Sequence, residues 1–315
     1  MMKQPLIILT GPTAVGKTKM SIALAKAVGG EIISADSMQV YRQMDIGSAK
    51  IRPEEMDGIR HHLIDVLDPD EAFHVVRFQE MAKAAMDQIY GRHKIPILTG
   101  GTGFYIQAVL YDIDFTENGG DSAYRRELEG LARENGPEFL HRMLAQVDAR
   151  SAEEIHAHNV KRTIRALEYF HQTGEKISEH NQEQREKESP YNFAYFVLND
   201  ERQRLYERID RRVDEMLEDG LEEEVIRLKD RGFTRDMVSM QGLGYKEMLD
   251  YLEGNCSLEE AVTVIKRDTR HFAKRQITWF KRERDVIWLD KDKADHDEDV
   301  LLNQMLGELK RRQIV

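Results

Sequence analysis

The sequence predicts an α/β fold in which a parallel sheet is flanked by helices and is interrupted by a mostly helical insertion. Short apolar runs alternate with helical patterns over most of the 315 residues. The first run leads into a glycine-rich phosphate loop, and between about 115 and 190 the alternation stops without a convincing strand. We therefore expect a P-loop NTPase-like core domain made of 1–114 and 191–315, with an insertion domain at 115–190.

Six apolar runs are the expected strands of the sheet. They are 5–10, 31–35, 62–66, 95–99, 193–198 and 286–289. Because the runs are continuously apolar, both faces of each strand should be buried, as in a parallel sheet covered by helices. Crossover helices are expected at 16–28 and 74–92, and insertion helices at 122–134, 137–146 and 159–172.

The composition is that of an ordinary globular protein. Hydrophobic residues make up 41% of the chain and charged residues 33%, and no apolar run approaches the roughly 20 residues that span a bilayer. The first residues lead directly into a strand, which indicates no secretory signal. Cys256 is the single cysteine, which excludes an internal disulfide. We expect a cytoplasmic monomer that has no membrane partner.

The phosphate loop is the most informative stretch of the chain. Its sequence, GPTAVGKT, fits the pattern G-x-x-x-x-G-K-[ST] between a strand and a helix, the setting that this motif requires. Backbone N–H groups of such a loop surround phosphate oxygens, Lys17 adds positive charge, and the Thr18 hydroxyl can ligate Mg²⁺. The candidate phosphate ligands are Gly11, Pro12, Thr13, Ala14, Val15, Gly16, Lys17 and Thr18.

Two more candidates follow expected strands at the same edge of the sheet, where ligands of open parallel sheets bind. Asp36 comes after the second strand. Its carboxylate could ligate Mg²⁺ or act as a general base, or it could cap a local turn. Thr102 comes after the fourth strand, in a second glycine-rich turn. Its hydroxyl could contact a phosphate or a reacting group, or cap a helix.

Charge is distributed unevenly along the chain. The net charge of −11 argues against a nucleic-acid partner, but 266–284 holds eight Lys or Arg against two acids. Lys266, Arg270, Lys274 and Lys281 share one face of the expected helix. We favour contact with an RNA backbone over a solvated face.

A row of arginines in 200–218 leaves a similar choice. Arg204, Arg208 and Arg212 recur at four-residue intervals. Such a row is usually a solvated face with acidic partners, although an arginine directed at the crevice could clamp a diphosphate. Two histidine pairs, His61–His62 and His156/His158, lack further ligands at zinc-like spacing, which favours structural roles.

Taken together, these motifs resemble those of the tRNA dimethylallyltransferases, also called tRNA isopentenyltransferases. The segments that carry the resemblance are GPTAVGKT (11–18), SADSMQVYRQMDIGSAK (34–50), HHLIDVLDP (61–69), LTGGTGFY (98–105), NVKRTIRALE (159–168), RIDRRVDEMLEDGLEEEV (208–225), QGLGYKEM (241–248) and TRHFAKRQITWF (269–280). The resemblance implies transfer of a dimethylallyl group from dimethylallyl diphosphate to N6 of adenine-37 in tRNA, with Mg²⁺. A single cysteine cannot build the zinc finger of eukaryotic relatives, so the resemblance is to the bacterial type.

The resemblance also implies residue roles. The phosphate loop would hold the diphosphate together with Arg208, Asp36 would be the general base, and Thr102 would line the channel near the adenine amino group. The adenine must be extruded from the anticodon loop to reach this site. The implied contacts with the tRNA anticodon stem-loop are Asp36, Ser37, Met38, Gln39, Thr102, Arg125, Val160, Lys161, Arg162, Thr163, Ile164, Gln241, Gly242, Leu243, Gly244, Tyr245, Lys246, Lys274, Arg275 and Gln276.

Three other functions stay open at this point. An adenylate isopentenyltransferase would share the loop and Asp36 but would need neither the insertion nor the basic helix. A P-loop nucleotide kinase would transfer phosphate from ATP to a nucleoside monophosphate. A nucleotide-gated RNA-binding module would need no general base.

Overall fold

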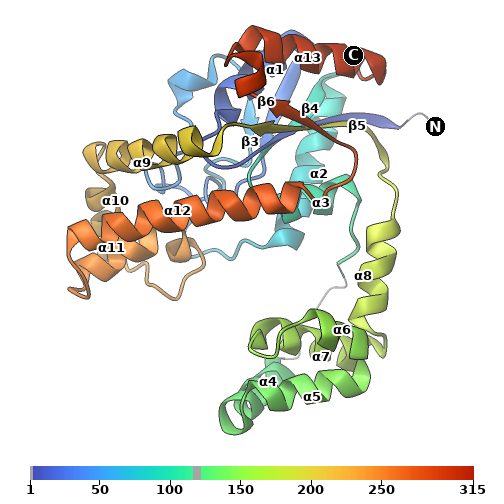
Figure 1. Cartoon of the computed structure of the whole chain (residues 1–315), viewed down its shortest axis with the longest axis vertical. Helices are drawn as coiled ribbons and strands as arrows, with labels where there is room; N and C mark the ends of the chain where they lie inside the picture. The colour runs from blue at the N-terminus through green and yellow to red at the C-terminus, as the bar shows by residue number, and fades with distance from the viewer. Residues whose placement is uncertain (1–2, 116–121) are drawn as a thin grey trace. The chain divides into compact units, whose positions relative to one another are not determined.

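The computed structural model describes residues 3–115 and 122–315. Within them, six strands form one sheet in the order β3-β2-β4-β1-β5-β6, and every neighbouring pair is parallel. The strands are β1 (Gln4–Thr10), β2 (Gly30–Ser34), β3 (His61–His62), β4 (Ile95–Gly100), β5 (Tyr191–Asn199) and β6 (Val286–Asp290). The α/β class and the parallel sheet are thereby confirmed (Figure 1).

The chain divides into two compact units. The first contains Met1–Leu110 and Pro190–Val315, and the second contains Tyr111–Ser189. Residues 1, 2 and 116–121, which fall in the expected domain ranges, lie outside the described residues. The helices that the structure describes are too short or too polar to cross a bilayer.

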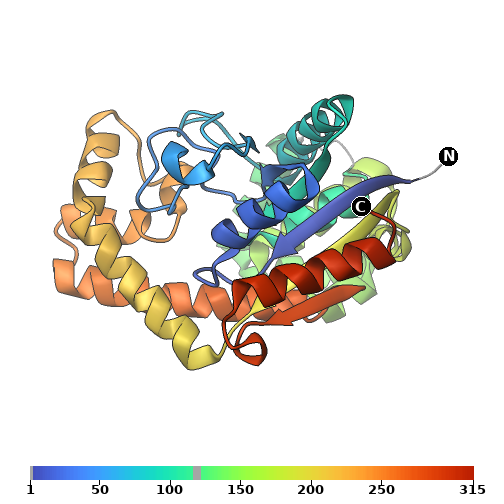
Figure 2. The ribbon, with the colours of Figure 1, turned by 90° about the horizontal axis from the view of Figure 1, so that it is seen from above.

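The described part of the first unit has eight helices, some of which cover the two faces of its sheet. They are α1 (Lys17–Val28), α2 (Val75–Gly91), α3 (Gly103–Leu110), α9 (Arg202–Glu218), α10 (Leu221–Asp230), α11 (Tyr245–Leu252), α12 (Leu258–Phe280) and α13 (Glu298–Arg311). Short 3₁₀ turns occur at η1 (Pro53–Met56), η2 (Ser239–Gln241) and η3 (Asp292–Ala294). Figure 2 shows α13 lying along the sheet.

The strands are continuously apolar because side chains on both of their faces are buried. Ile7 and Leu9 of β1 join a core cluster with α1, α9 and α13. Leu6 and Ile8, which alternate with them, are equally buried and face the side where α2 and α3 pack against the sheet. Successive side chains of a strand point to opposite faces, so a strand covered on both sides has no polar position.

One expected strand is shorter than its sequence suggests. The run 62–66 was expected to be a strand, but β3 ends at His62. Leu63 and Asp65 have φ angles of 63° and 54°, which an extended strand cannot contain. The apolar run therefore predicts a longer strand than the structure has, because the chain bends at 63–65 instead of continuing β3.

The second unit is entirely helical in its described part. Its helices are α4 (Ser122–Asn135), α5 (Pro137–Val147), α6 (Ala149–Glu154), α7 (Val160–Thr173) and α8 (Ile177–Glu186). Leu128, Leu140, Leu144 and Leu167 belong to its own buried cluster. Asp148, which is buried, accepts hydrogen bonds from the backbone N–H and hydroxyl groups of Ser151 and Ser178, which joins the starts of α6 and α8.

Candidate functional site

The phosphate loop connects β1 to α1, as its motif requires. Gly16 is the N-cap of α1, with φ 98° and ψ 27°, a left-handed conformation that favours glycine. Lys17 is the first helical residue, and its Nζ donates hydrogen bonds to the carbonyl oxygens of Gly11 (3.0 Å) and Pro12 (2.9 Å). The lysine side chain thus folds back over the loop. An anion bound in the loop could replace the two carbonyl oxygens as the hydrogen-bond acceptor of its ammonium group.

The electrostatic environment of Lys17 is unusual. Burial, followed by the charge of Arg212, lowers the pKa of Lys17 to about 8, although Asp36 acts in the opposite direction. Lys17 is half-buried by its surface exposure. A cation that is partly removed from water beside a second cation is destabilised, and an anion between them would relieve this. The loop is therefore suited to an anionic ligand.

Asp36 and the phosphate loop line the same cavity. Its walls include Lys17, Thr18 and Asp36, with the neighbouring residues Ser21, Ile32, Ser34, Gln39, Ile51, His61, Ile64, Thr99 and Gly100. Asp36 follows β2, and its Oδ1 accepts hydrogen bonds from the backbone N–H groups of Met38 (2.8 Å) and Gln39 (3.4 Å). Oδ2 has no hydrogen-bond partner among the described residues. One oxygen therefore caps the turn, and the other is available for chemistry.

Thr102 is bonded through its backbone to the residue that precedes Asp36. Its backbone N–H donates to the carbonyl oxygen of Ala35 (3.3 Å), the residue before Asp36. Its own carbonyl accepts from the N–H groups of Tyr105 and Ile106, at the start of α3. The second glycine-rich turn is thereby joined to the turn that carries Asp36.

Gln276 fastens both glycine-rich turns to α12. Its Oε1 accepts from the backbone N–H of Thr13 (2.8 Å), and its Nε2 donates to the carbonyl oxygen of Gly101 (3.0 Å). The side chain is buried. Although Gln276 is an expected tRNA contact, the structure places its amide between the phosphate loop and the second turn.

Three cations from other elements approach the loop. A Cβ at Gly16 would lie 3.3 Å from Lys291 Nζ and 3.4 Å from Arg208 Nη2. Arg208 Nη1 lies 3.6 Å from the buried carboxylate of Asp200. The third cation is Arg212, which is half-buried. Its pKa is lowered by burial and by the charge of Arg208, and its field reaches Asp36.

Sequence reasoning identified Arg208 but missed Lys291 and the position of Arg212. Lys291 directly follows β6, is only 7% exposed, and donates to the carbonyl oxygen of Val15 (3.3 Å). Its place after a strand at the ligand edge of the sheet was a usable signal. Arg212 belongs to the row of arginines on α9, and their spacing does not indicate which face of the helix lies against the phosphate loop.

The basic face of α12 is partly neutralised by α9. Lys266 forms an ion pair with Asp214 (2.5 Å), and Arg270 pairs with Asp210. The acids that compensate this half of the row thus come from another helix. Towards its C-terminal end, α12 instead lines an open hollow of about 460 Å³, whose walls are His271, Lys274, Arg275, Thr278, Trp279 and Arg282.

The remaining expected tRNA contacts are distributed over both units. In the segment 241–246, Tyr245 is fully buried, whereas Gln241 is exposed. In the second unit, Arg125 forms two hydrogen bonds with Glu168 (2.9 and 2.7 Å). The segment 160–164 opens α7, where Lys161 and Arg162 are exposed and Thr163 and Ile164 are buried.

No dedicated metal cage is found in the described part of the chain, since no three His, Cys, Asp or Glu side chains converge there. His62 pairs with Glu31 (2.8 Å) and His158 with Glu138 (3.6 Å). The Thr18 hydroxyl and the Asp36 carboxylate supply oxygen atoms to the lining of one cavity. Such a pair suits a hard cation that is also held by a phosphate.

Comparison with known proteins agrees with these features. The profile of the family described as IPP transferase matches residues 39–283. A tRNA dimethylallyltransferase of Lachnoclostridium phytofermentans is 63% identical over 99% of both chains. The crystal structure of a tRNA isopentenylpyrophosphate transferase from Bacillus halodurans superimposes with a TM-score of 0.74, at 46% identity over 99% of this chain and 98% of that one.

A more distant likeness extends the comparison to eukaryotes. A eukaryotic dimethylallyltransferase captured acting on tRNA has a TM-score of 0.80 and is 31% identical, over 91% of this chain and 74% of that chain. The profile and the full-length identity lead to one assignment. This chain belongs to the IPP transferase family, among the bacterial tRNA dimethylallyltransferases.

Proposed function

We propose that this protein transfers a dimethylallyl group from dimethylallyl diphosphate to N6 of adenine-37 in the anticodon loop of tRNA. The observation that carries the proposal is one cavity lined by Lys17 and Thr18 of the phosphate loop and by the carboxylate of Asp36. An anion site and a base on the same cavity can hold a donor and activate an acceptor together.

The phosphate loop and its cations act on the leaving group. As the bond between the allylic carbon and the diphosphate oxygen breaks, negative charge grows on the diphosphate. In this proposal Lys17, Arg208 and the backbone N–H groups of the loop stabilise this charge. The closeness of Arg208 Nη2 to Gly16 supports its role.

Mg²⁺ fits the residues present. The Thr18 hydroxyl is an oxygen ligand on the cavity that would receive the diphosphate, and Mg²⁺ is usually held by one or two protein oxygens together with phosphates. When bound, the ion would neutralise part of the charge on the leaving diphosphate. In this proposal Thr18 is its main protein ligand.

Asp36 acts on the acceptor. The N6 nitrogen of adenine forms a bond to the allylic carbon, the diphosphate departs with the electrons of the broken C–O bond, and a proton leaves N6. In this proposal the Oδ2 atom of Asp36 takes the proton, since Oδ1 is held by the N–H groups of Met38 and Gln39. Thr102, next to this turn, would help to orient the amino group.

Both substrates require the cavity to widen. Its volume is about 60 Å³, room for about two water molecules. A purine and a prenyl chain are larger, so the cavity has to widen as they enter. The adenine would arrive extruded from the loop, and the basic end of α12, with Lys274 and Arg275, would contact the RNA backbone.

The experiment is a product analysis. The protein is incubated with tRNA, dimethylallyl diphosphate and Mg²⁺, and the digested nucleosides are analysed by mass spectrometry for dimethylallyl-adenosine at position 37. Parallel reactions supply AMP instead of tRNA, or ATP with a nucleoside monophosphate. Alkylated AMP without alkylated tRNA would support an adenylate isopentenyltransferase, and ADP release without alkylation would support a kinase.

A further inference from the structure

The turn 44–48, which follows the Asp36 turn in the chain, is held by a buried carboxylate from another element. Glu224, in the first turn of α10, accepts backbone N–H groups from Asp45 (2.9 Å), Ile46 (2.9 Å) and Gly47 (3.1 Å). The hydroxyl of Tyr245 donates to the same carboxylate (2.8 Å). Four donors fill the acceptor sites of the carboxylate, which explains how Glu224 can be only 2% exposed.

The turn 44–48 and the segment 241–246 pack tightly around this carboxylate. A Cβ at Gly47 would lie 2.6 Å from Tyr245 Cζ, so the turn rests directly on the tyrosine ring. A Cβ at Gly242 would lie 2.5 Å from the methyl group of Met38. The segment 241–246 therefore contacts the residues 36–48 at two points, Gly47 and Met38. Tyr245, which makes the contact with Gly47, is fully buried.

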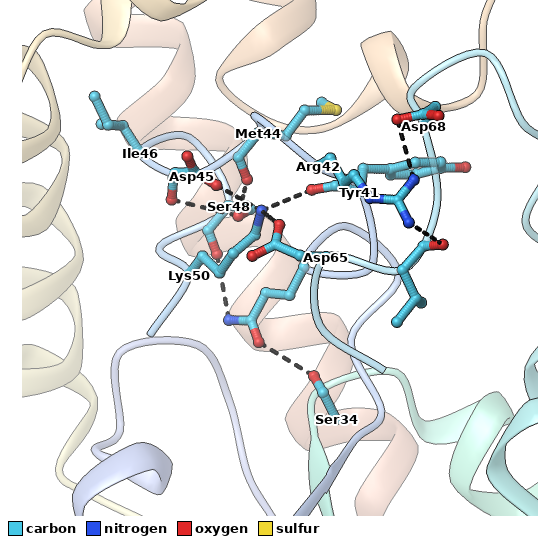
Figure 3. A network of polar contacts seen from close by, with 12 residues as sticks. Ser34, Tyr41, Arg42, Met44, Asp45, Ile46, Ser48, Lys50, Asp65 and Asp68 are labelled. Carbon is cyan, nitrogen blue, oxygen red and sulfur yellow. Dashed lines mark hydrogen bonds and ion pairs between the residues drawn. The ribbon is translucent and has the colours of Figure 1, made fainter. Parts of the chain in front are cut away.

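The turn is also held from its other side. Lys50 Nζ donates to Asp45 Oδ1 (2.6 Å), to Asp65 Oδ1 (2.5 Å) and to the carbonyl oxygen of Tyr41 (2.6 Å). Figure 3 shows Lys50 at the centre of this network. Asp45 thus binds Glu224 through its N–H and Lys50 through its side chain, so the two sets of contacts meet in one residue.

The turn is connected to the cavity through Gln39. The Nε2 of Gln39 donates to the carbonyl oxygens of Ser48 (3.5 Å) and Ala49 (3.2 Å), and its Oε1 accepts from Ser34 Oγ (3.1 Å). Gln39, Asp36 and Ser34 all line the cavity. The position of the turn therefore sets one wall of the site, the wall that carries the carboxylate of Asp36.

We propose that Glu224 is a positioning residue: with Tyr245 it fixes the turn 44–48 and, through Gln39, holds Asp36 at the distance from the phosphate loop that the reaction needs. Glu224 touches neither substrate. Its loss should lower turnover without weakening diphosphate binding, because the phosphate loop is fastened separately through Gln276. The turnover part of this proposal rests on the proposed function, whereas the anchoring of the turn does not.

The test compares Glu224→Gln with Glu223→Gln. Both substitutions remove one charge from the first turn of α10, but Glu223 is exposed. In Glu224→Gln, an NH₂ group replaces one oxygen that faces backbone donors. We expect amide hydrogen exchange in 45–47 to accelerate roughly tenfold or more. kcat should fall on the order of tenfold, while the Kd for inorganic pyrophosphate and the KM for dimethylallyl diphosphate change less than about twofold. Glu223→Gln should match the wild type in each measurement.

Tyr245→Phe is the milder second variant. It keeps the ring under Gly47 and removes one donor, so an intermediate change in both exchange and kcat is expected. Unchanged exchange in 45–47 would overturn the anchoring, and faster exchange with normal kcat would overturn the positioning role. A fall in kcat matched by an equal loss of pyrophosphate affinity would show general damage and equally overturn it. If the wild type shows no prenyl transfer, the proposed function fails, and the exchange data still decide whether Glu224 anchors the turn.

Discussion

At the scale of single residues, the phosphate loop is approached by positively charged side chains from other elements. Arg208 and Lys291 approach Gly16, and Arg212 acts on Lys17 strongly enough to lower its pKa. Asp200 and Asp36 offset only part of this charge. A folded protein that keeps like charges together against their repulsion is organised to receive an anion.

The first prediction concerns the pH dependence of pyrophosphate binding. Lys17 in the free protein has a pKa of about 8, and a bound anion favours its protonated form. Above pH 8, binding must therefore take up a proton, so affinity should fall by up to about tenfold per pH unit, whereas below pH 8 this contribution is flat. Calorimetric titration of pyrophosphate between pH 6.5 and 9.5 measures this. Lys17→Arg, which stays charged, is the control, and an equal decline in that variant would contradict the assignment.

The second prediction separates the two roles of Asp36. In Asp36→Asn the side-chain oxygen can still accept the N–H of Met38 (2.8 Å in the wild type), but the amide cannot take a proton. Turnover should fall at least about 100-fold, with pyrophosphate affinity and melting temperature near wild-type values. Single-turnover assays with saturating donor and tRNA measure the chemical step. An asparagine variant that reacts at close to the normal rate would exclude Asp36 as the base.

The sequence predicts site residues that belong to local patterns and misses those that depend on folding. Lys17 and Thr18 end the loop motif that follows β1, Asp36 comes shortly after β2, and the structure brings all three to one cavity. Gln276 bonds to a residue 263 positions away, and Lys291 to one 276 positions away. No spacing rule links such partners. Only the general rule about strand ends pointed to Lys291, and nothing in the local pattern pointed to the amide of Gln276.

Among the elements, α12 combines three functions along one helix. Ala273, Gln276 and Phe280 are buried against the sheet domain, while Lys266 and Arg270 bind the acidic side of α9. Lys274 and Arg275 are exposed beside the basic hollow. A sequence pattern showed the basic row but could not show that α9 supplies acids to half of it, because the two helices are joined only in the fold.

The third prediction tests this division of α12. Replacing Lys274 and Arg275 by Gln should weaken tRNA binding and reduce the slope of log K against log salt by roughly one to two, because each phosphate contact contributes about 0.7–0.9. Lys266→Gln should leave the slope unchanged, since its ammonium group is paired with Asp214. Filter binding at several salt concentrations measures both variants. Equal slopes for wild type and double variant would remove this end of α12 from the interface.

At the scale of the whole molecule, each of the two units has buried apolar residues of its own. The sheet of the first unit buries α1, α9 and α13 on one face, and the helices of the second unit bury their own leucine cluster. From the loss of strand patterns near residue 115, the sequence predicts an insertion domain at 115–190. It predicts too long a strand at β3, because the positive φ angles of Leu63 and Asp65 cannot occur in an extended strand.

The last prediction follows from the separation of the cores. Leu144 is fully buried in the second unit, so Leu144→Ala should destabilise that unit by roughly 2–5 kcal/mol. Because no residue of the pyrophosphate site belongs to this core, pyrophosphate affinity should stay at the wild-type value while tRNA modification is lost on warming. Hydrogen exchange should accelerate in α5 and α7 and stay slow in β1 and β4. Leu24 belongs to the buried cluster of the first unit. In Leu24→Ala, hydrogen exchange should accelerate in β1 and β4 and stay slow in α5 and α7. Exchange that accelerates equally in both units for either variant would mean that the two cores unfold as one cooperative structure.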